Sequence, residues 1–125
     1  MDLAQRRFAD TVVLAAAGRI DHASAEAFRA ALSPHLERCA PGQDRVVLDL
    51  SGVDYISSAG LRVLMLARKQ AKMQGGTFAV AGLTPVVKEI FEISRFTLVF
   101  EIYPSVRDAL AQISPPALAA FEAGA

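Results

Sequence analysis

The sequence predicts a single α/β domain with a mixed, mostly parallel sheet of four to five strands and helices packed against it. Two observations support this fold class. Short apolar, β-branched runs alternate with segments whose apolar residues recur every three or four positions, which indicates strands joined by crossover helices. Two extended runs near the N-terminus are separated only around Asp10, which indicates a hairpin and therefore one antiparallel pair.

The opening hairpin consists of RRFAD and TVVLAAAG, and the second run ends at Gly18. Ser24 can then cap a helix whose apolar residues follow a spacing of three and four: Ala25, Phe28, Ala31, Leu32 and Leu36. Pro34 falls inside this pattern. Because proline lacks an N–H group and crowds the carbonyl four residues earlier, we expect a kink or an early stop near Ser33.

The middle of the chain continues the alternation of strands and helices. After the loop CAPGQD, RVVLDL predicts a strand buried on both faces that ends at Ser51-Gly52. A helix is expected from Ser58 to Gln74, with basic residues in its later turns and Gly75-Gly76 as its stop. TFAVAG predicts the next strand, and Thr84-Pro85 supplies a cap and a first-turn proline for another helix.

The end of the chain predicts one more strand and helix. The strand is FTLVFEIY, and the helix SVRDALAQI begins with a capping box from Ser105 to Asp108. Residues 114–125 lie beyond these elements and form either a short helix packed through Leu118 and Phe121 or a frayed tail. We therefore divide the chain into a domain over residues 1–113 and a C-terminal extension over residues 114–125.

The composition narrows the classes of partner and location. The chain has 125 residues, 53% of them apolar, and a formal net charge of zero, so its charge does not favour nucleic acid or an anionic membrane as partner. No segment approaches the ~18 consecutive apolar residues of a membrane span. Cys39 is the single cysteine, which excludes an intramolecular disulfide. We expect a cytoplasmic protein.

The candidates for catalysis or metal binding are few. His22 and His35 have no cysteine or paired acidic neighbours at ligand spacing, so surface or capping roles are favoured. Cys39 has no nearby histidine in the sequence to activate it. Asp49 and Asp54 have the chemistry of a general acid and base or of a Mg²⁺ site, but turn hydrogen bonds are the more common role. We predict no catalytic residues, no metal and no cofactor, and hence no enzyme.

A serine pair, Ser57 and Ser58, lies where a strand gives way to a helix. Ser58 can cap this helix by accepting an N–H bond from Gly60 or Leu61. The same N-terminus can hold a phosphate, because its free N–H groups carry partial positive charge and small neighbours leave the hydroxyl open to a kinase. Local physics alone favours the plain cap, since phosphoacceptor caps are rare.

At these residues the sequence resembles a known family. VVLDLSGVDYISSAGLRVL is similar to the signature of STAS domains, specifically bacterial anti-sigma factor antagonists. Three further segments resemble the same family, so that the likeness extends from about residue 5 to 113: GRIDHASAEAFRAAL, GGTFAVAGLTPVVKEIFEISRF and EIYPSVRDAL. The resemblance implies a domain that binds a kinase-type anti-sigma factor when unphosphorylated and so frees a sigma factor. Serine phosphorylation would prevent this binding, and a metal-dependent serine phosphatase would remove the phosphate.

The resemblance also implies particular site residues. The family's acceptor is the first residue of a Ser-[Ser/Thr/Ala]-Gly-Leu string, which is Ser58 here, with Ser57 as the alternative acceptor in the place where many members have an acid. Arg62, one turn later, is positioned to pair with a phosphate on Ser58. The expected partner-binding residues are Asp21, Ser57, Ala59, Gly60 and Arg62.

Two other functions stay open at this point. The first is a STAS domain that acts without phosphorylation, as a ligand-sensing or scaffold subunit of a signalling or lipid-transport assembly. Genomic neighbours would separate this role from that of an antagonist. A neighbouring transporter operon favours the scaffold or ligand-sensing subunit, and a neighbouring kinase-like anti-sigma gene favours the antagonist. A free-standing enzyme is the least favoured function for want of a catalytic set.

Overall fold

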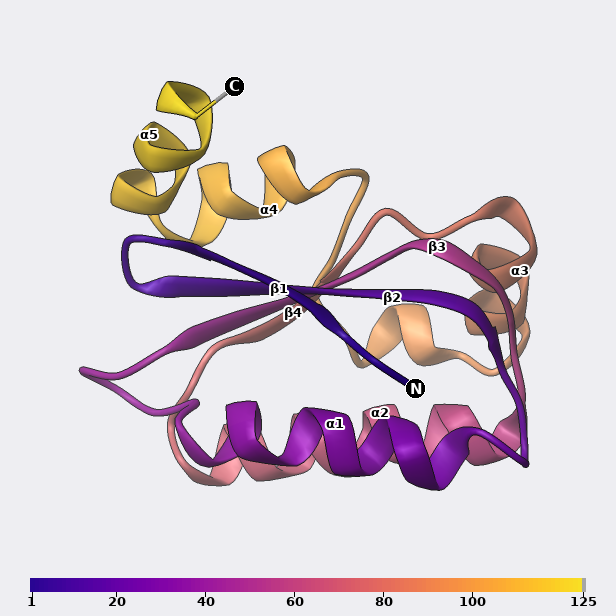
Figure 1. Cartoon of the computed structure of the whole chain (residues 1–125). Coiled ribbons are helices and arrows are strands. Elements are labelled where there is room, and N and C mark those ends of the chain that lie inside the picture. The colour runs from indigo at the N-terminus through magenta and orange to yellow at the C-terminus, as the bar shows by residue number, and fades with distance from the viewer. Residues whose placement is uncertain (125) are drawn as a thin grey trace.

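The computed structural model describes residues 1–124, in which five strands form one sheet in the order of the chain (Figure 1). The strands are β1 (Ala4–Phe8), β2 (Thr11–Ile20), β3 (Arg45–Ile56), β4 (Phe78–Ala81) and β5 (Ile102–Tyr103). β1 and β2 pair antiparallel as a hairpin, and each later strand pairs parallel to the strand before it. The predicted α/β class with a mixed, mostly parallel sheet is therefore confirmed.

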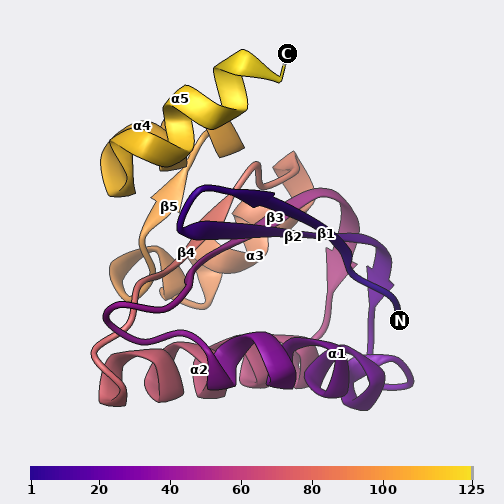
Figure 2. The same ribbon diagram turned by 60° about the vertical axis from the view of Figure 1, so that its left-hand side comes forward.

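The helices lie on both faces of this sheet. Figure 2 shows α1 (Ala25–Glu37) and α2 (Ser58–Met73) side by side in one layer, with α4 (Val106–Ile113) and α5 (Pro115–Ala123) in the opposite layer. α3 (Pro85–Ile93) and the short helix η1 (Phe96–Leu98) are the remaining elements of residues 1–124. The larger core includes Phe28, Leu64 and Phe91, and a smaller core on the other face includes Phe8 and Leu110. Alternate residues of β2 and β3 enter the two cores, as expected of buried strands.

Helix α1 passes through Pro34, so the predicted early stop near Ser33 is wrong. The proline lies in the last turn, where its missing N–H deprives only the carbonyl of Ala30 of a helical partner. Both Ala30 and Pro34 are exposed, which leaves that carbonyl accessible to water. A proline near the end of a helix is tolerated for this reason.

Strands β2 and β3 both run past the glycines at which they were predicted to end. β2 continues beyond Gly18 to Ile20, and β3 continues beyond Gly52 to Ile56. The pairing register shifts around Gly18, whose φ is +88°, so this glycine accommodates an irregularity within the sheet. The glycines mark a β-bulge rather than the ends of strands.

Most of the predicted strand FTLVFEIY is not a strand. Arg95 adopts the left-handed region with φ +61°, η1 follows it, and only Ile102 and Tyr103 pair with β4. Phe96 instead packs against Phe91 and Phe100, with ring centroids 5.7 and 5.4 Å away. Packing of this aromatic cluster overrides the strand propensity of the segment.

Within the C-terminal extension, Pro115–Ala123 form the helix α5. Leu118 and Phe121 are partly buried against the smaller core, and the Phe121 ring meets Phe8 of β1 edge-on at 5.3 Å. Ser114 is buried between α4 and α5 and donates its hydroxyl to the Asp10 carboxylate at 2.6 Å. Residues 114–124 are thus tied to the opening hairpin.

Candidate functional site

The site lies where β2 and β3 end side by side. Ile20 pairs with Ile56 in the parallel register, and the N–H of Ser57 donates to the carbonyl of Ile20 at 2.8 Å. Asp21 follows Ile20 directly, and Ser58 begins α2 directly after Ser57. The structure therefore brings Asp21 and both serines to one edge of the sheet.

Ser57, not Ser58, is the N-cap of α2. The backbone of Ser57 is extended (φ −84°, ψ 172°), and its hydroxyl oxygen accepts the Gly60 N–H at 3.2 Å. The predicted cap at Ser58 is one residue too late, because β3 continues to Ile56 and leaves Ser57 alone at the junction. A cap oxygen reaches the N–H two or three residues ahead, which is the spacing from Ser57 to Gly60.

The hydroxyl of Ser58 is left free by this arrangement. Ser58 is the first residue of α2 and is exposed, and within residues 1–124 its side chain makes no hydrogen bond. The first turn of α2 holds no acidic side chain. An exposed hydroxyl beside the positive end of a helix macrodipole is compatible with a negatively charged modification.

Gly60 is buried, so it cannot present a surface to a partner in the way its predicted binding role implied. A Cβ at this position would lie 2.8 Å from side-chain carbons of both Ile20 and Ile56. Glycine therefore lets α2 begin close against the ends of β2 and β3. Its part in the site is to fix the position of Ser58.

Asp21 is half-buried and held by a reciprocal pair of hydrogen bonds with Ser24. Its carboxylate accepts the Ser24 N–H at 3.0 Å, and its own N–H donates to the Ser24 hydroxyl at 2.9 Å. The N–H of Ser24 is the largest cause of the lowered pKa of the Asp21 carboxyl. A fixed negative charge thus lies at the same edge as the serines.

Ala59 and Arg62 lie close to Ser58 on the first turn and a half of α2. Ala59 is half-buried, whereas Arg62 is exposed and forms no ion pair in the described part of the chain. Sequence reasoning missed a neighbouring contact, in which the Arg19 guanidinium lies 4.4 Å from the Tyr55 ring centre. These two residues pair across β2 and β3 because the register shifts near Gly18, and a glycine inside a strand pattern is the sequence signal that could have indicated this bulge.

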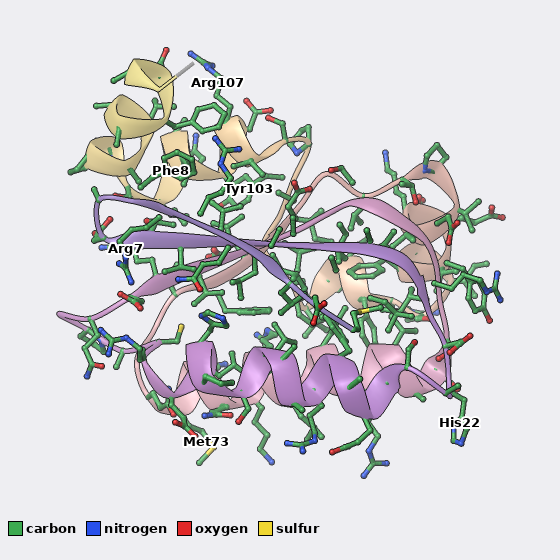
Figure 3. All side chains as sticks on the ribbon, in the orientation of Figure 1. Arg7, Phe8, His22, Met73, Tyr103 and Arg107 are labelled. Atoms are coloured by element: carbon green, nitrogen blue, oxygen red, sulfur yellow. The ribbon has the colours of Figure 1, made fainter. Side chains whose placement is uncertain are left out.

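The other sequence candidates do not gather into a catalytic or metal centre. His22 is exposed and precedes α1. Figure 3 shows it at one end of the layer formed by α1 and α2, with Met73 marking the opposite end. Burial lowers the pKa of His35 and raises that of Cys39. Asp49 accepts the Ser51 N–H at 2.9 Å, a local hydrogen bond of the kind expected. Across residues 1–124 no group of three or more metal-ligating side chains converges.

Comparison with known proteins identifies the family. A model of the STAS domain matches residues 3–109. The chain belongs to the STAS domain family. BtrV of Bordetella bronchiseptica, a candidate anti-sigma factor antagonist by name, is 43% identical over 101 residues, which cover 81% of this STAS domain chain and 84% of BtrV. A STAS-domain protein of Pseudomonas aeruginosa is 34% identical over 68% of this chain and 80% of its own.

Solved structures share the fold of this STAS domain. The structure of a candidate anti-sigma factor antagonist of Thermotoga maritima has a TM-score of 0.80 at 21% identity and covers 89% of this chain and 93% of its own. SpoIIAA, an anti-sigma factor antagonist solved in its unphosphorylated form, has a TM-score of 0.71 at 16% identity, over 89% of this chain and 95% of its own. Among the helices described here, none has the length and apolar character needed to cross a membrane.

Proposed function

We propose that this STAS domain is an anti-sigma factor antagonist that works in the cytoplasm. In its unphosphorylated form it binds a kinase-type anti-sigma factor, and the sigma factor held by that protein is released. The 43% identity to BtrV supports this role. The observation that carries the proposal is the exposed Ser58 hydroxyl. This hydroxyl does not cap α2, because Ser57 is the N-cap.

Phosphorylation of Ser58 by the anti-sigma factor is the off switch. The Ser58 oxygen attacks the γ-phosphorus of ATP, a new O–P bond forms, the bond to the leaving ADP breaks, and a base on the kinase takes the hydroxyl proton. A serine phosphatase then hydrolyses the phosphoserine to serine and inorganic phosphate. This STAS domain is the substrate of both reactions and catalyses neither.

The fold is suited to carry the phosphate without rearrangement. The N–H groups of Ser58 and Ala59 at the start of α2 have no helical acceptor, and the guanidinium of Arg62 lies one turn later. Both features favour a phosphate on Ser58, which would carry a charge of about −1.5 to −2. The phosphate therefore changes the partner-facing surface much more than it changes the stability of the domain.

The expected partner contacts surround this hydroxyl. Asp21, Ser57, Ala59 and Arg62 form the rim of the surface, and Gly60 acts beneath it through packing. A partner packed over Ala59 would have to desolvate a doubly charged group once Ser58 is phosphorylated. The coupling between phosphorylation and binding should therefore exceed the ~1–3 kcal/mol typical of allosteric coupling.

The proposal is tested with the purified chain and the kinase-type anti-sigma factor encoded in the same genome. After incubation with ATP, mass spectrometry should find the phosphate on Ser58. Ser58→Ala should abolish transfer, while Ser57→Ala, which keeps the Ser58 hydroxyl, should still receive phosphate on Ser58, at a reduced rate because it loses the helix cap and a rim contact. Phosphate on Ser57 in the parent protein would refute the assignment of the acceptor.

Binding is measured by titration calorimetry on the same proteins. Ser58→Ala should bind the anti-sigma factor as tightly as the parent, and Ser58→Asp should lose binding. Equal affinity of the parent, Ser58→Ala and Ser58→Asp would contradict the switch. It would indicate instead a scaffold role that does not depend on phosphorylation.

A further inference from the structure

A second surface lies on the outer side of α2, away from Ser58. Of the large apolar side chains that remain exposed in residues 1–124, three belong to this helix: Met65 at 38%, Leu66 at 51% and Met73 at 78% exposure. Figure 3 shows Met73 directed away from the sheet into solvent. Met73 lies about 22 Å along the helix from Ser58, so the proposed switch does not account for these side chains.

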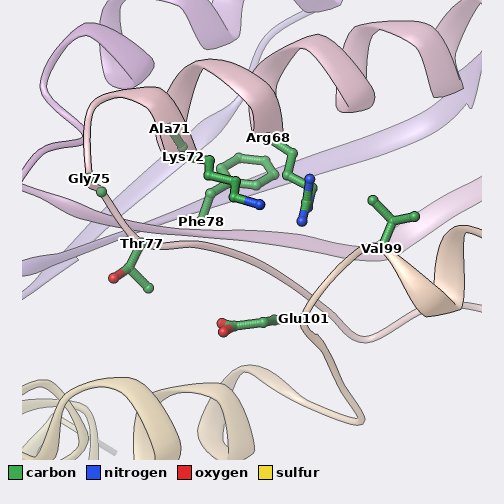
Figure 4. Close-up of a pocket in the computed structure, with 9 residues that line it drawn as sticks. Arg68, Ala71, Lys72, Gly75, Thr77, Phe78, Val99 and Glu101 are labelled. Carbon is green, nitrogen blue, oxygen red and sulfur yellow. The ribbon is translucent and has the colours of Figure 1, made fainter.

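The charges on α2 are all of one sign. The helix carries Arg62, Arg68, Lys69 and Lys72 and has no aspartate or glutamate between residues 58 and 73. None of these four cations has an ion-pair partner within the described chain, although the chain as a whole has zero formal net charge. In Figure 4, Arg68 and Lys72 point into a pocket of about 360 Å³ with Glu101 on its far side. The face as a whole keeps an excess of positive charge.

The same side of α2 is a shallow, open surface that leads into a narrow cleft between α1 and α2, and we refer to the two together as the groove. A hollow of about 500 Å³ lies beside Leu66, Lys69 and Met73. It shares Leu66 and Gln70 with a narrower cleft of about 120 Å³ between α1 and α2, whose floor is formed by the buried side chains of Leu32 and Leu36. On the α1 side, the carboxylate of Glu26 is already engaged by Arg29. A groove between two helices is the usual seat for a third, amphipathic helix.

We propose that this groove, lined by Leu66, Lys69, Gln70 and Met73, is a second docking surface that binds an acidic amphipathic helix of a partner protein. The apolar side chains of such a helix would cover Leu66 and Met73, and its carboxylates would face Lys69 and Arg62. An anionic membrane is the poorer occupant. Basic and apolar residues alternate along the exposed side of α2, in the order Arg62, Leu66, Lys69 and Met73, whereas a membrane-bound helix segregates them to opposite faces.

The surface is independent of the proposed switch, so it can be tested separately. The probe is a synthetic 20-residue helical peptide with a leucine stripe flanked by glutamates, and it is titrated into the isotope-labelled full chain by NMR. Resonances of residues 62–73 and of the facing side of α1 should shift. Ser58→Asp should bind this peptide as the parent does, which distinguishes failure of this proposal from failure of the switch.

A matched pair of variants supplies the specificity control. Leu66→Ser/Lys69→Glu should weaken binding of the acidic peptide by about tenfold or more. Val86→Ser/Lys88→Glu likewise replaces an apolar side chain and a lysine on α3, where Val86 is also 51% exposed, and should leave the affinity unchanged. Circular dichroism confirms that both variants are folded.

Two outcomes would overturn the proposal. One is equal binding of a peptide in which every glutamate is replaced by lysine, because the surface would then not select acidic partners. The other is binding of the chain to vesicles of phosphatidylglycerol and phosphatidylcholine, lost in Leu66→Ser/Lys69→Glu, without shifts from the acidic peptide. That result would assign the surface to a membrane.

Discussion

The backbone N–H of Gly60 donates to the hydroxyl oxygen of Ser57 at 3.2 Å, and this bond leaves the adjacent Ser58 hydroxyl without a partner among residues 1–124. Two serines that are neighbours in sequence therefore differ in their physical role. Ser57 holds the helix terminus, and Ser58 presents an oxygen to solvent. Stability measurements can separate these roles without any partner.

Ser57→Ala is expected to lower the free energy of unfolding by about 1 kcal/mol, because it removes the N-cap of α2. Ser58→Ala should change it by less than about 0.5 kcal/mol, since the exposed hydroxyl makes no bond. Urea denaturation followed by circular dichroism checks both values. A larger loss at Ser58 than at Ser57 would show that the cap had been assigned to the wrong serine.

Gly60→Ala is expected to destabilise the domain by about 1–3 kcal/mol, because its Cβ would lie 2.8 Å from carbons of Ile20 and Ile56. Gly124→Ala is the control. Its Cβ would meet only ordinary contacts beyond 3.7 Å, so the same chemical change should have little effect. Thermal melts of the two variants give the comparison, and equal melting temperatures would argue against close packing at Gly60.

The sequence predicted the elements whose signal is local. The helical spacing of α2, the apolar run of β3 and the N-cap at Ser105 all depend on neighbours within one or two turns, and all are present. These features needed no knowledge of distant contacts.

The predictions that failed depend on the tertiary structure. Arg95 and the ring cluster around Phe96 replace most of a strand because the aromatic side chains find a common core. The N-cap of α2 is Ser57 rather than the predicted Ser58, because pairing with β2 extends β3 to Ile56. Likewise, the burial of Gly60 follows from how closely α2 approaches two strand ends. These three features depend on contacts between segments far apart in the sequence, which no local pattern predicts.

The stability of the domain should fall in acid because of Asp44. Its carboxylate bonds to the guanidinium of Arg7 at 3.0 and 3.1 Å and to that of Arg38 at 3.2 Å. The hydrogen bond from Arg7 is the largest cause of the lowered pKa of Asp44. A carboxyl whose folded pKa is depressed stabilises the fold above its unfolded pKa of about 3.9, and this contribution is lost as pH falls toward the folded value.

The corresponding test compares the parent with Asp44→Asn. At pH 7 the variant should be less stable by about 1–2 kcal/mol, a range that allows for the solvent exposure of both arginines. As the pH falls below about 4, the difference in free energy of unfolding between the parent and the variant should narrow, because only the parent loses the Asp44 charge. Asp54→Asn, at an exposed aspartate of β3, is the control. A gap that stays constant with pH would exclude the ion pair as its source.

Arg62 should lower the second pKa of a phosphate on Ser58. A guanidinium one helical turn away favours the dianion over the monoanion. Phosphorus NMR titration of the phosphorylated chain should therefore give a lower pKa than the same titration of the Arg62→Ala variant. Arg62→Lys, which keeps the charge, should lie between the two. Identical curves for the parent and Arg62→Ala would show that the side chain does not reach the phosphate.

The contact between α5 and the opening hairpin should contribute measurably to stability. Ser114 is buried, its hydroxyl donates to Asp10 at 2.6 Å, and its oxygen also accepts the Ala117 N–H in the first turn of α5. Ser114→Ala should therefore cost about 1–3 kcal/mol, because it removes a cap and leaves a partly buried carboxylate without one donor.

Phe121→Ala tests the apolar side of the same contact. It removes a ring that packs edge-on against Phe8, so a loss of about 1–3 kcal/mol is expected for this partly buried side chain. Leu98→Ala, at a side chain that is 79% exposed, is the control and should have little effect. Hydrogen exchange should show faster exchange in α5 and β1 together for Ser114→Ala and Phe121→Ala. Faster exchange confined to α5 would mean that the helix folds on the sheet without stabilising the hairpin beneath it.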